Sequence, residues 1–156
     1  VFASSGSTVS AYEREEPWRA LVAGRYDDLP RGADGGPVWP MVTVHMAARP
    51  AGFYGMSKVA GEALARHYAD AHGLSALCVR IGHVTEADRP VTPRDFSVWC
   101  SQRDVAGALA LALAAPAVPG CAVVFVTSRN RWGYRDLAHT RAVLGWEPLD
   151  AAEDHR

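Results

Sequence analysis

Residues 54–82, YGMSKVAGEALARHYADAHGLSALCVRIG, combine a helical pattern with a buried-strand pattern. Apolar residues recur at helical spacing over residues 54–72, which are therefore predicted to form a helix. Residues 75–81 (SALCVRI) are almost continuously apolar and are predicted to form a buried strand. The apolar stripe of the predicted helix consists of Met56, Val59, Ala60, Ala63 and Leu64.

The segments on either side continue the alternation of strand and helix. Ser101 and Asp104 form a capping-box pattern at the start of a helix predicted over residues 101–115. The other predicted elements are strands at residues 1–4 and 121–127, a loop at 5–12, and a helix at 134–144. Strands that alternate with helices are typical of α/β folds. We predict an α/β fold with a mostly parallel sheet.

Residues 13–50 are rich in glycine and proline and are predicted to form a long irregular loop or insertion, with a short helix around Glu15–Ala23. Structureless stretches of this length are uncommon in compact domains and are usually functional. The length of 156 residues suits one domain, so residues 1–156 are predicted to form a single domain.

Composition excludes several functional classes. The chain is 49% hydrophobic and 21% charged, with a net charge of −1, which is not the basic balance of a nucleic-acid-binding protein. No apolar run is long enough to cross a bilayer, and no secretory signal opens the chain. The three cysteines are widely spaced, which favours reduced thiols in the cytoplasm. The histidines and cysteines lack metal-ligand spacing, so we expect no metal site.

Tyr54 and Lys58 are the first candidates for chemistry. They are four residues apart on the predicted helix and therefore share one face. A neighbouring ammonium favours the charged form of a phenol, so such a pair can work as an acid/base unit. Lys58 is the only lysine beside 15 arginines, which indicates a position where arginine does not serve.

Ser4, Ser5 and Ser7 directly follow the first predicted strand. In α/β folds, groups that contact ligands gather at the carboxyl ends of strands. A serine hydroxyl at this place can hydrogen-bond a substrate oxygen, although a polar loop would have the same composition.

Four blocks of sequence, in this order, resemble the extended short-chain dehydrogenase/reductases, the NAD-dependent epimerase/dehydratase family. The blocks are Val1–Ser5 (VFASS), Tyr54–Lys58 (YGMSK) with Gly61-Glu62, Arg80–Val84 (RIGHV) and Arg103–Ala106 (RDVA). Within the family the chain is most similar to the uronate dehydrogenases. The similar stretches are Arg49-Pro50, Arg80–Gly82, and a tail of Asn130 to Asp136 followed by Leu144-Gly145-Trp146-x-Pro148. The resemblance implies a Rossmann-like, doubly wound sheet with a small C-terminal substrate-binding portion.

The resemblance also implies catalytic and cofactor-binding roles. Tyr54 would be the general acid/base, Lys58 would bind the nicotinamide ribose, and Ser5 would orient the reacting oxygen. The implied cofactor is NAD, with NADP not excluded. The residues implied to bind it are Ala3, Ser4, Tyr54, Lys58, Ile81, Gly82 and His83.

For the substrate, the resemblance implies a sugar or sugar acid. The implied contacts are Ser5, Gly6, Ser7, His83 and Arg94. Arg94 falls where the uronate enzymes hold the substrate carboxylate, although it could equally be a surface residue paired with Asp95 or Glu86. Gly6 and Ser7 stand where these enzymes usually carry Asn-His, and His83 replaces a small polar residue. These departures concern the substrate and not the reaction class.

The Gly-rich turn with which this family binds its dinucleotide is absent from the 156 residues. The chain therefore resembles the C-terminal part of such an enzyme. We expect these residues alone to bind NAD weakly or not at all and to turn over no substrate. We also expect them to self-associate through an open sheet edge and an exposed apolar patch.

Two alternatives to a sugar or uronate dehydrogenase remain. One is a sugar-nucleotide epimerase or dehydratase, which uses the same residues in a larger pocket. The other is an inactive remnant that serves as an interaction module. The predicted partners are a small-molecule substrate and, as an open possibility, further copies of the chain, with no nucleic acid and no membrane.

Overall fold

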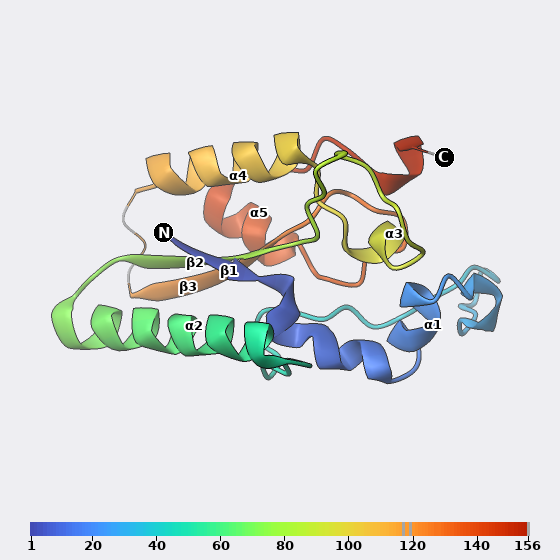
Figure 1. Ribbon diagram of the computed structural model, residues 1–156, viewed down its shortest axis with the longest axis horizontal. Coiled ribbons are helices and arrows are strands. Elements are labelled where there is room, and N and C mark those ends of the chain that lie inside the picture. The colour runs from blue at the N-terminus through green and yellow to red at the C-terminus, as the bar shows by residue number, and fades with distance from the viewer. Residues whose placement is uncertain (117, 119, 156) are drawn as a thin grey trace.

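A three-stranded parallel sheet lies between layers of helices in the computed structural model of the protein (Figure 1). The structure describes residues 1–116, 118 and 120–155. The sheet has the order β1-β2-β3, with β1 (Phe2–Ser5), β2 (Ala76–Ile81) and β3 (Cys121–Val126). Both pairs of neighbours are parallel, which confirms the predicted α/β class and places the carboxyl ends of the strands at one edge.

Helices cover both faces of the sheet (Figure 1). Helix α2 (Phe53–His72) lies on one face, and α4 (Gln102–Ala114) and α5 (Ala138–Leu144) lie on the other. Successive side chains of β2 point to opposite faces of the sheet, as the two-residue period of a strand requires. Cys78 packs in the cluster on the α2 side, and Val79 packs in the cluster on the α4 and α5 side.

The face of α2 that packs on the sheet consists of small and polar residues. A Cβ on Gly61 would lie 2.2 Å from the Cζ of Phe2 in β1, so only glycine allows this approach of helix and strand. The predicted apolar stripe lies mainly on the other side. Met56 and Leu64 expose 53% and 58% of their surface.

The predicted loop at residues 5–12 is wrong, because the chain forms a 3-10 helix, η1 (Gly6–Arg14). The hydroxyl of Ser5 accepts a hydrogen bond from the backbone N–H of Ser7 at 3.1 Å. The hydroxyl of Thr8 donates to the carbonyl of Ser5 at 2.9 Å. These short-range bonds close the turn directly after β1.

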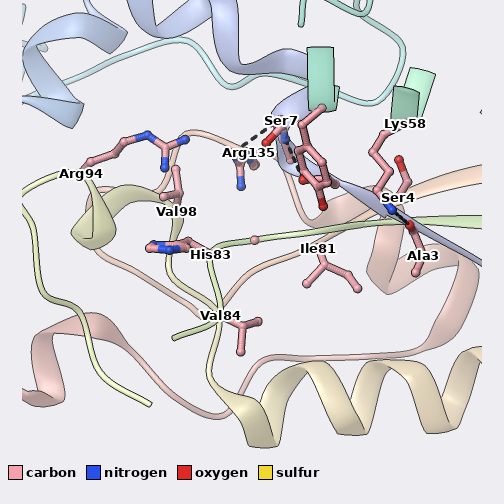
Figure 2. A pocket seen from close by; sticks show the side chains of 14 residues that line it. Ala3, Ser4, Ser7, Lys58, Ile81, His83, Val84, Arg94, Val98 and Arg135 are labelled. Carbon is pink, nitrogen blue, oxygen red and sulfur yellow. Dashed lines mark hydrogen bonds between the residues drawn. The ribbon is translucent and has the colours of Figure 1, made fainter. Parts of the chain in front are cut away.

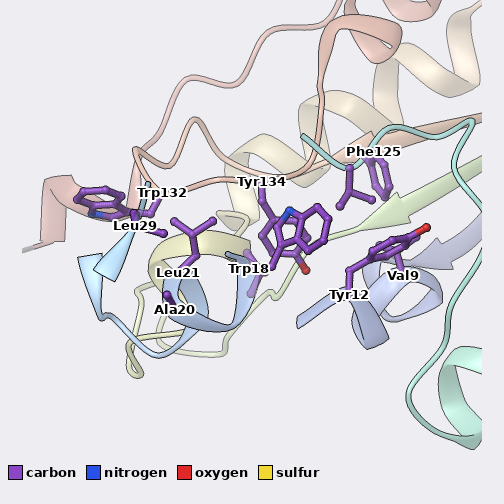
Figure 3. Packing of buried hydrophobic residues seen from close by; sticks show 11 residues of the cluster. Val9, Tyr12, Trp18, Ala20, Leu21, Leu29, Phe125, Trp132 and Tyr134 are labelled. Atoms are coloured by element: carbon purple, nitrogen blue, oxygen red, sulfur yellow. The ribbon is translucent and has the colours of Figure 1, made fainter. Parts of the chain in front are cut away.

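Within residues 13–50, the predicted short helix is confirmed as α1 (Trp18–Val22), and a 3-10 turn, η2 (Tyr26–Asp28), follows it. The segment is held by an aromatic core (Figure 3). Tyr26 stacks on Trp132 with ring centroids 3.8 Å apart. The buried residues of this core are Val9, Tyr12, Trp18, Ala20, Leu21, Leu29, Val42, Val98, Phe125, Trp132 and Tyr134.

The last long helix, α5, begins four residues later than the predicted start at residue 134. The backbone N–H of Val42 donates to the carbonyl of Tyr134 at 2.7 Å, and the N–H of Asp136 donates to the carbonyl of Val42 at 3.0 Å. This strand-like pairing holds the intervening Arg135 extended. A backbone paired in this way cannot also form the first turn of a helix.

The N-terminus of α4 carries only half of the predicted capping box. The hydroxyl of Ser101 accepts from the N–H of Asp104 at 2.9 Å. The carboxylate of Asp104 instead accepts from Ser128 and from the backbone of Leu149. The remaining short elements are α3 (Asp95–Val98) and the 3-10 turn η3 (Ala152–His155). Among the described residues, no helix is both long and apolar enough to cross a membrane.

Candidate active site

A cavity of about 380 Å³ opens where the carboxyl ends of β1 and β2 meet (Figure 2). Every residue that the sequence analysis assigned to the site lines this cavity. These residues are Ala3, Ser4, Ser5, Gly6, Ser7, Tyr54, Lys58, Ile81, Gly82, His83 and Arg94. Parallel strands therefore bring together segments that are far apart in the sequence.

Tyr54 and Lys58 project from the first turns of α2. The Nζ of Lys58 donates to the carbonyl of Ala3 at 2.9 Å and lies 5.5 Å from the centroid of the Tyr54 ring. Tyr54 is 60% exposed. Its hydroxyl has no hydrogen-bond partner in the described part of the chain. The pair therefore offers a free hydroxyl beside a fixed positive charge.

A buried ion pair holds α2 against the strands beneath it. The Nε and Nη2 of Arg80 donate to the two carboxylate oxygens of Glu62 at 2.9 and 2.7 Å. The hydroxyl of Ser4 also donates to Glu62. Because this network ties α2 to both β1 and β2, it determines where Tyr54 and Lys58 stand over the cavity. It also engages the hydroxyl of Ser4.

Ser5 and Ser7 contribute hydroxyl groups at the end of β1. The oxygen of Ser5 accepts from the backbone of Ser7, which leaves the Ser5 proton available to a ligand. The hydroxyl of Ser7 has no partner in the part of the chain that the structure describes. Both groups can therefore hydrogen-bond an oxygen placed in the cavity.

His83 is paired with the buried Asp95. Its Nδ1 lies 2.6 Å from the carboxylate of Asp95. Burial alone would raise the pKa of Asp95, but hydrogen bonds from the backbone N–H groups of Thr92 and Val91 and from His83 outweigh burial and lower it. Because an ionised carboxylate only accepts, Nδ1 carries a proton. This pairing fixes the orientation of the imidazole ring at the cavity wall.

Arg94 reaches the cavity wall, but its guanidinium is held by Glu13. Its Nε and Nη2 each donate to Glu13 at 2.7 Å. The hydroxyl of Tyr134 donates to the same carboxylate at 2.6 Å. Burial alone would raise the pKa of Glu13, but the hydrogen bonds from Arg94 and Tyr134 lower it. The ion-pair partner of Arg94 is therefore neither Asp95 nor Glu86.

The sequence analysis missed three residues that line the cavity: Val84, Val98 and Arg135. Val84 and Val98 supply apolar surface. Arg135 lies in the segment that was predicted to be the first turn of a helix, and a charged residue there is unremarkable in sequence. Arg135 lies in the tail on which the chain resembles the uronate dehydrogenases, but its approach to the cavity depends on the pairing with Val42, which no local pattern reveals.

The three cysteines, Cys78, Cys100 and Cys121, are free and buried. Burial is also the main reason why the pKa of Cys100 is raised, which disfavours a reactive thiolate. The sequence prediction of reduced, inert thiols agrees with this arrangement.

No family model matches the chain. A uronate dehydrogenase of Agrobacterium fabrum is 43% identical over 109 residues, which are 70% of this chain and 40% of that protein. An NAD-dependent glucose-6-phosphate dehydrogenase of Haloferax volcanii is 31% identical over 150 residues, 96% of this chain and 52% of that protein.

Among solved structures, a mutant uronate dehydrogenase from Agrobacterium tumefaciens in complex with NAD matches with a TM-score of 0.69 and 32% identity. The match covers 99% of this chain and 48% of that one. The chain is a uronate dehydrogenase-like member of the extended short-chain dehydrogenase/reductases. This uronate dehydrogenase-like chain spans about half the length of the curated relatives it matches.

The cavity of the uronate dehydrogenase-like chain suits the nicotinamide-ribose end of a dinucleotide. Lys58 donates one of its three N–H bonds to the carbonyl of Ala3, which leaves two donors that the hydroxyl groups of a ribose can accept. The side chain of Ile81 adds apolar surface to the same wall. The chemistry of these groups therefore fits a nicotinamide nucleotide.

Proposed function

We propose that the protein carrying this chain oxidises a hydroxyl group of a sugar or a uronic acid, with NAD as cofactor and NADP not excluded. The observation that carries the proposal is the free Tyr54 hydroxyl beside Lys58, in one cavity with Ser5. The similarity to uronate dehydrogenases supports the same reaction class.

In the proposed reaction, Tyr54 acts as a phenolate and removes the proton from the substrate hydroxyl. The positive charge of Lys58 stabilises the phenolate electrostatically. Ser5 donates a hydrogen bond to the same substrate oxygen and keeps it in reach of Tyr54. NAD, when bound, supplies the acceptor for the hydride that leaves the carbon bearing this oxygen.

An acidic sugar is the proposed substrate because the cavity wall is positively charged. Lys58, Arg94 and Arg135 line it, and no aspartate or glutamate does so among the described residues. A carboxylate is attracted to such a wall, whereas a neutral sugar gains nothing from the charge. We propose roles for Ser7, Gly6 and His83 in holding the sugar, and for Ala3, Ser4, Ile81 and Gly82 beside the nicotinamide.

Steady-state formation of NADH by the complete protein that carries this chain tests the proposed function. The substrates to compare are D-glucuronate, D-galacturonate, D-glucose and UDP-glucuronate. We expect the kcat/KM for a uronate to exceed that for glucose by about tenfold or more, since a hydrogen bond to a charged group contributes about 1.5–3 kcal/mol. Conversion of UDP-glucuronate without net NADH would favour an epimerase instead, and no reaction with any sugar would contradict the proposal.

We further propose that the protein works in the reducing cytoplasm and assembles with copies of itself. The buried free cysteines support the first statement. The apolar surface that α2 exposes supports the second, since contiguous exposed apolar surface commonly marks an interface.

A further inference from the structure

Arg135 is a buried cation without a countercharge. Only 4% of the residue is exposed. Its Nη2 donates to the carbonyl of Gly6 at 3.3 Å and to the hydroxyl of Tyr134 at 3.4 Å. Its Nε and Nη1 are buried and have no partner, and no carboxylate among the described residues forms an ion pair with it. An unpaired buried charge costs several kcal/mol.

Glu13, whose pKa the charge of Arg135 helps to lower, is already engaged by other groups. Glu13 accepts two hydrogen bonds from Arg94 and one from Tyr134. One carboxylate thus faces two guanidinium groups, and the cluster of Glu13, Arg94 and Arg135 carries one excess positive charge. The fold provides no further acid for Arg135 within the described residues.

Glycine at position 6 makes room for this guanidinium. A Cβ on Gly6 would lie 2.3 Å from the Cζ of Arg135, far closer than any real contact. Any other residue at position 6 would therefore displace Arg135 from the cavity wall.

We propose that Arg135 binds the carboxylate of the acidic sugar. The inference rests on the proposed function, because it assigns a part of the same cavity to the substrate. Arg135 lines the cavity together with Arg94 and Ser7 (Figure 2). A carboxylate seated against this wall supplies the missing countercharge. Arg94, whose Nε and Nη2 are taken by Glu13, contributes less to this contact.

Direct binding of D-glucuronate and of D-glucose to the complete protein that carries this chain, measured by calorimetry with and without NAD, tests the inference. We expect the wild type to prefer glucuronate. Arg135→Met should weaken glucuronate binding by about tenfold or more and leave glucose binding unchanged. Arg94→Met should have a smaller effect. The matched control is Arg89→Met, an exposed arginine outside the cavity, which should behave as the wild type.

A thermal unfolding measurement separates binding from a structural role. Removing an uncompensated buried charge should leave the Tm of Arg135→Met equal to or above that of the wild type. A Tm lowered by several degrees, a failure to fold, or unchanged glucuronate affinity would overturn the inference. Equal binding of glucuronate and glucose by the wild type would overturn it as well.

Different experimental outcomes would contradict the proposed function and the proposed carboxylate site. Glucuronate binding that depends on Arg135, without formation of NADH, would contradict the function and leave the carboxylate site standing. NADH formation with the same KM for glucuronate in Arg135→Met and the wild type would contradict the site and leave the function standing.

Discussion

Lys58 both connects α2 to β1 and lines the candidate active site. Its stem leaves α2, and its ammonium binds the carbonyl of Ala3 at the end of β1, beside the ring of Tyr54. Because the chain contains 15 arginines and a single lysine, the sequence already marked this position. A compact ammonium suits the space between this carbonyl and this phenol ring. In the proposed function it also binds the ribose, which a planar guanidinium would hold less well.

Lys58→Arg should therefore weaken NAD binding by about tenfold or more, because at least one charge-assisted hydrogen bond of about 1.5–3 kcal/mol is lost. Calorimetric titration of NAD into the purified protein measures this change. Arg89→Lys, at an exposed position outside the cavity, is the control. An unchanged NAD affinity in Lys58→Arg would exclude the proposed ribose contact.

We expect the ionisation of Glu13 to make the free energy of unfolding depend on pH. Its pKa lies below the ordinary value of 4.5, so its ionised form stabilises the folded state fully above that value. This contribution is lost as the pH falls from 4.5 through the lowered pKa. Glu13→Gln should be less stable than the wild type at neutral pH. The difference in their free energies of unfolding should become smaller below pH 4.5.

Urea unfolding midpoints measured at several pH values test the role of Glu13. The control is Glu86→Gln, since Glu86 is exposed and its side chain lies outside this cluster. If the difference in unfolding midpoint between Glu13→Gln and the wild type stays constant as the pH falls, ionisation of Glu13 does not contribute to stability.

At the scale of elements, α2 carries the proposed acid/base pair, and a buried ion pair sets its position. Glu62 lies one turn after Lys58 and binds both Arg80 of β2 and Ser4 of β1. The helix was predictable from the spacing of its apolar residues. Its packing face was not, because Gly61 and Glu62 face the sheet and Leu64 faces outward.

Glu62→Met should destabilise the protein by about 3–5 kcal/mol, since it leaves Arg80 buried and unpaired. The double variant Glu62→Met, Arg80→Met should recover most of this loss, because two apolar side chains replace two charges. Urea unfolding of both single variants and the double variant measures the coupling. Additive losses would show that the two side chains do not act as a pair.

The exposed side of α2 should mediate self-association. We expect multi-angle light scattering after size exclusion to give a mass above that of one chain. Leu64→Lys should shift the mass toward the monomer, because it places a charge in the apolar surface. The matched control is Leu113→Lys, at an exposed leucine of α4, which should not change the measured mass. A monomeric wild type would contradict this prediction.

At the scale of the whole molecule, the parallel sheet collects the site at one edge. The order of strands and helices was predictable, and so were all of the cavity residues but Val84, Val98 and Arg135, because both follow from local patterns and a family resemblance. The 3-10 helix η1, the late start of α5 and the place of Arg135 were not. They depend on contacts between distant segments, such as Val42 with Tyr134, that leave no periodic trace in sequence.

The central claim is that Tyr54 exchanges the proton in an NAD-dependent oxidation of an acidic sugar. The rate of NADH formation from D-glucuronate by the complete protein that carries this chain, compared among the wild type, Tyr54→Phe and Tyr68→Phe, tests it most directly. Tyr68 is an exposed tyrosine on the same helix, outside the cavity. We predict that Tyr54→Phe lowers kcat by about 10²–10⁴-fold with NAD binding retained, and that Tyr68→Phe matches the wild type. A Tyr54→Phe rate within a few-fold of the wild type would contradict the account.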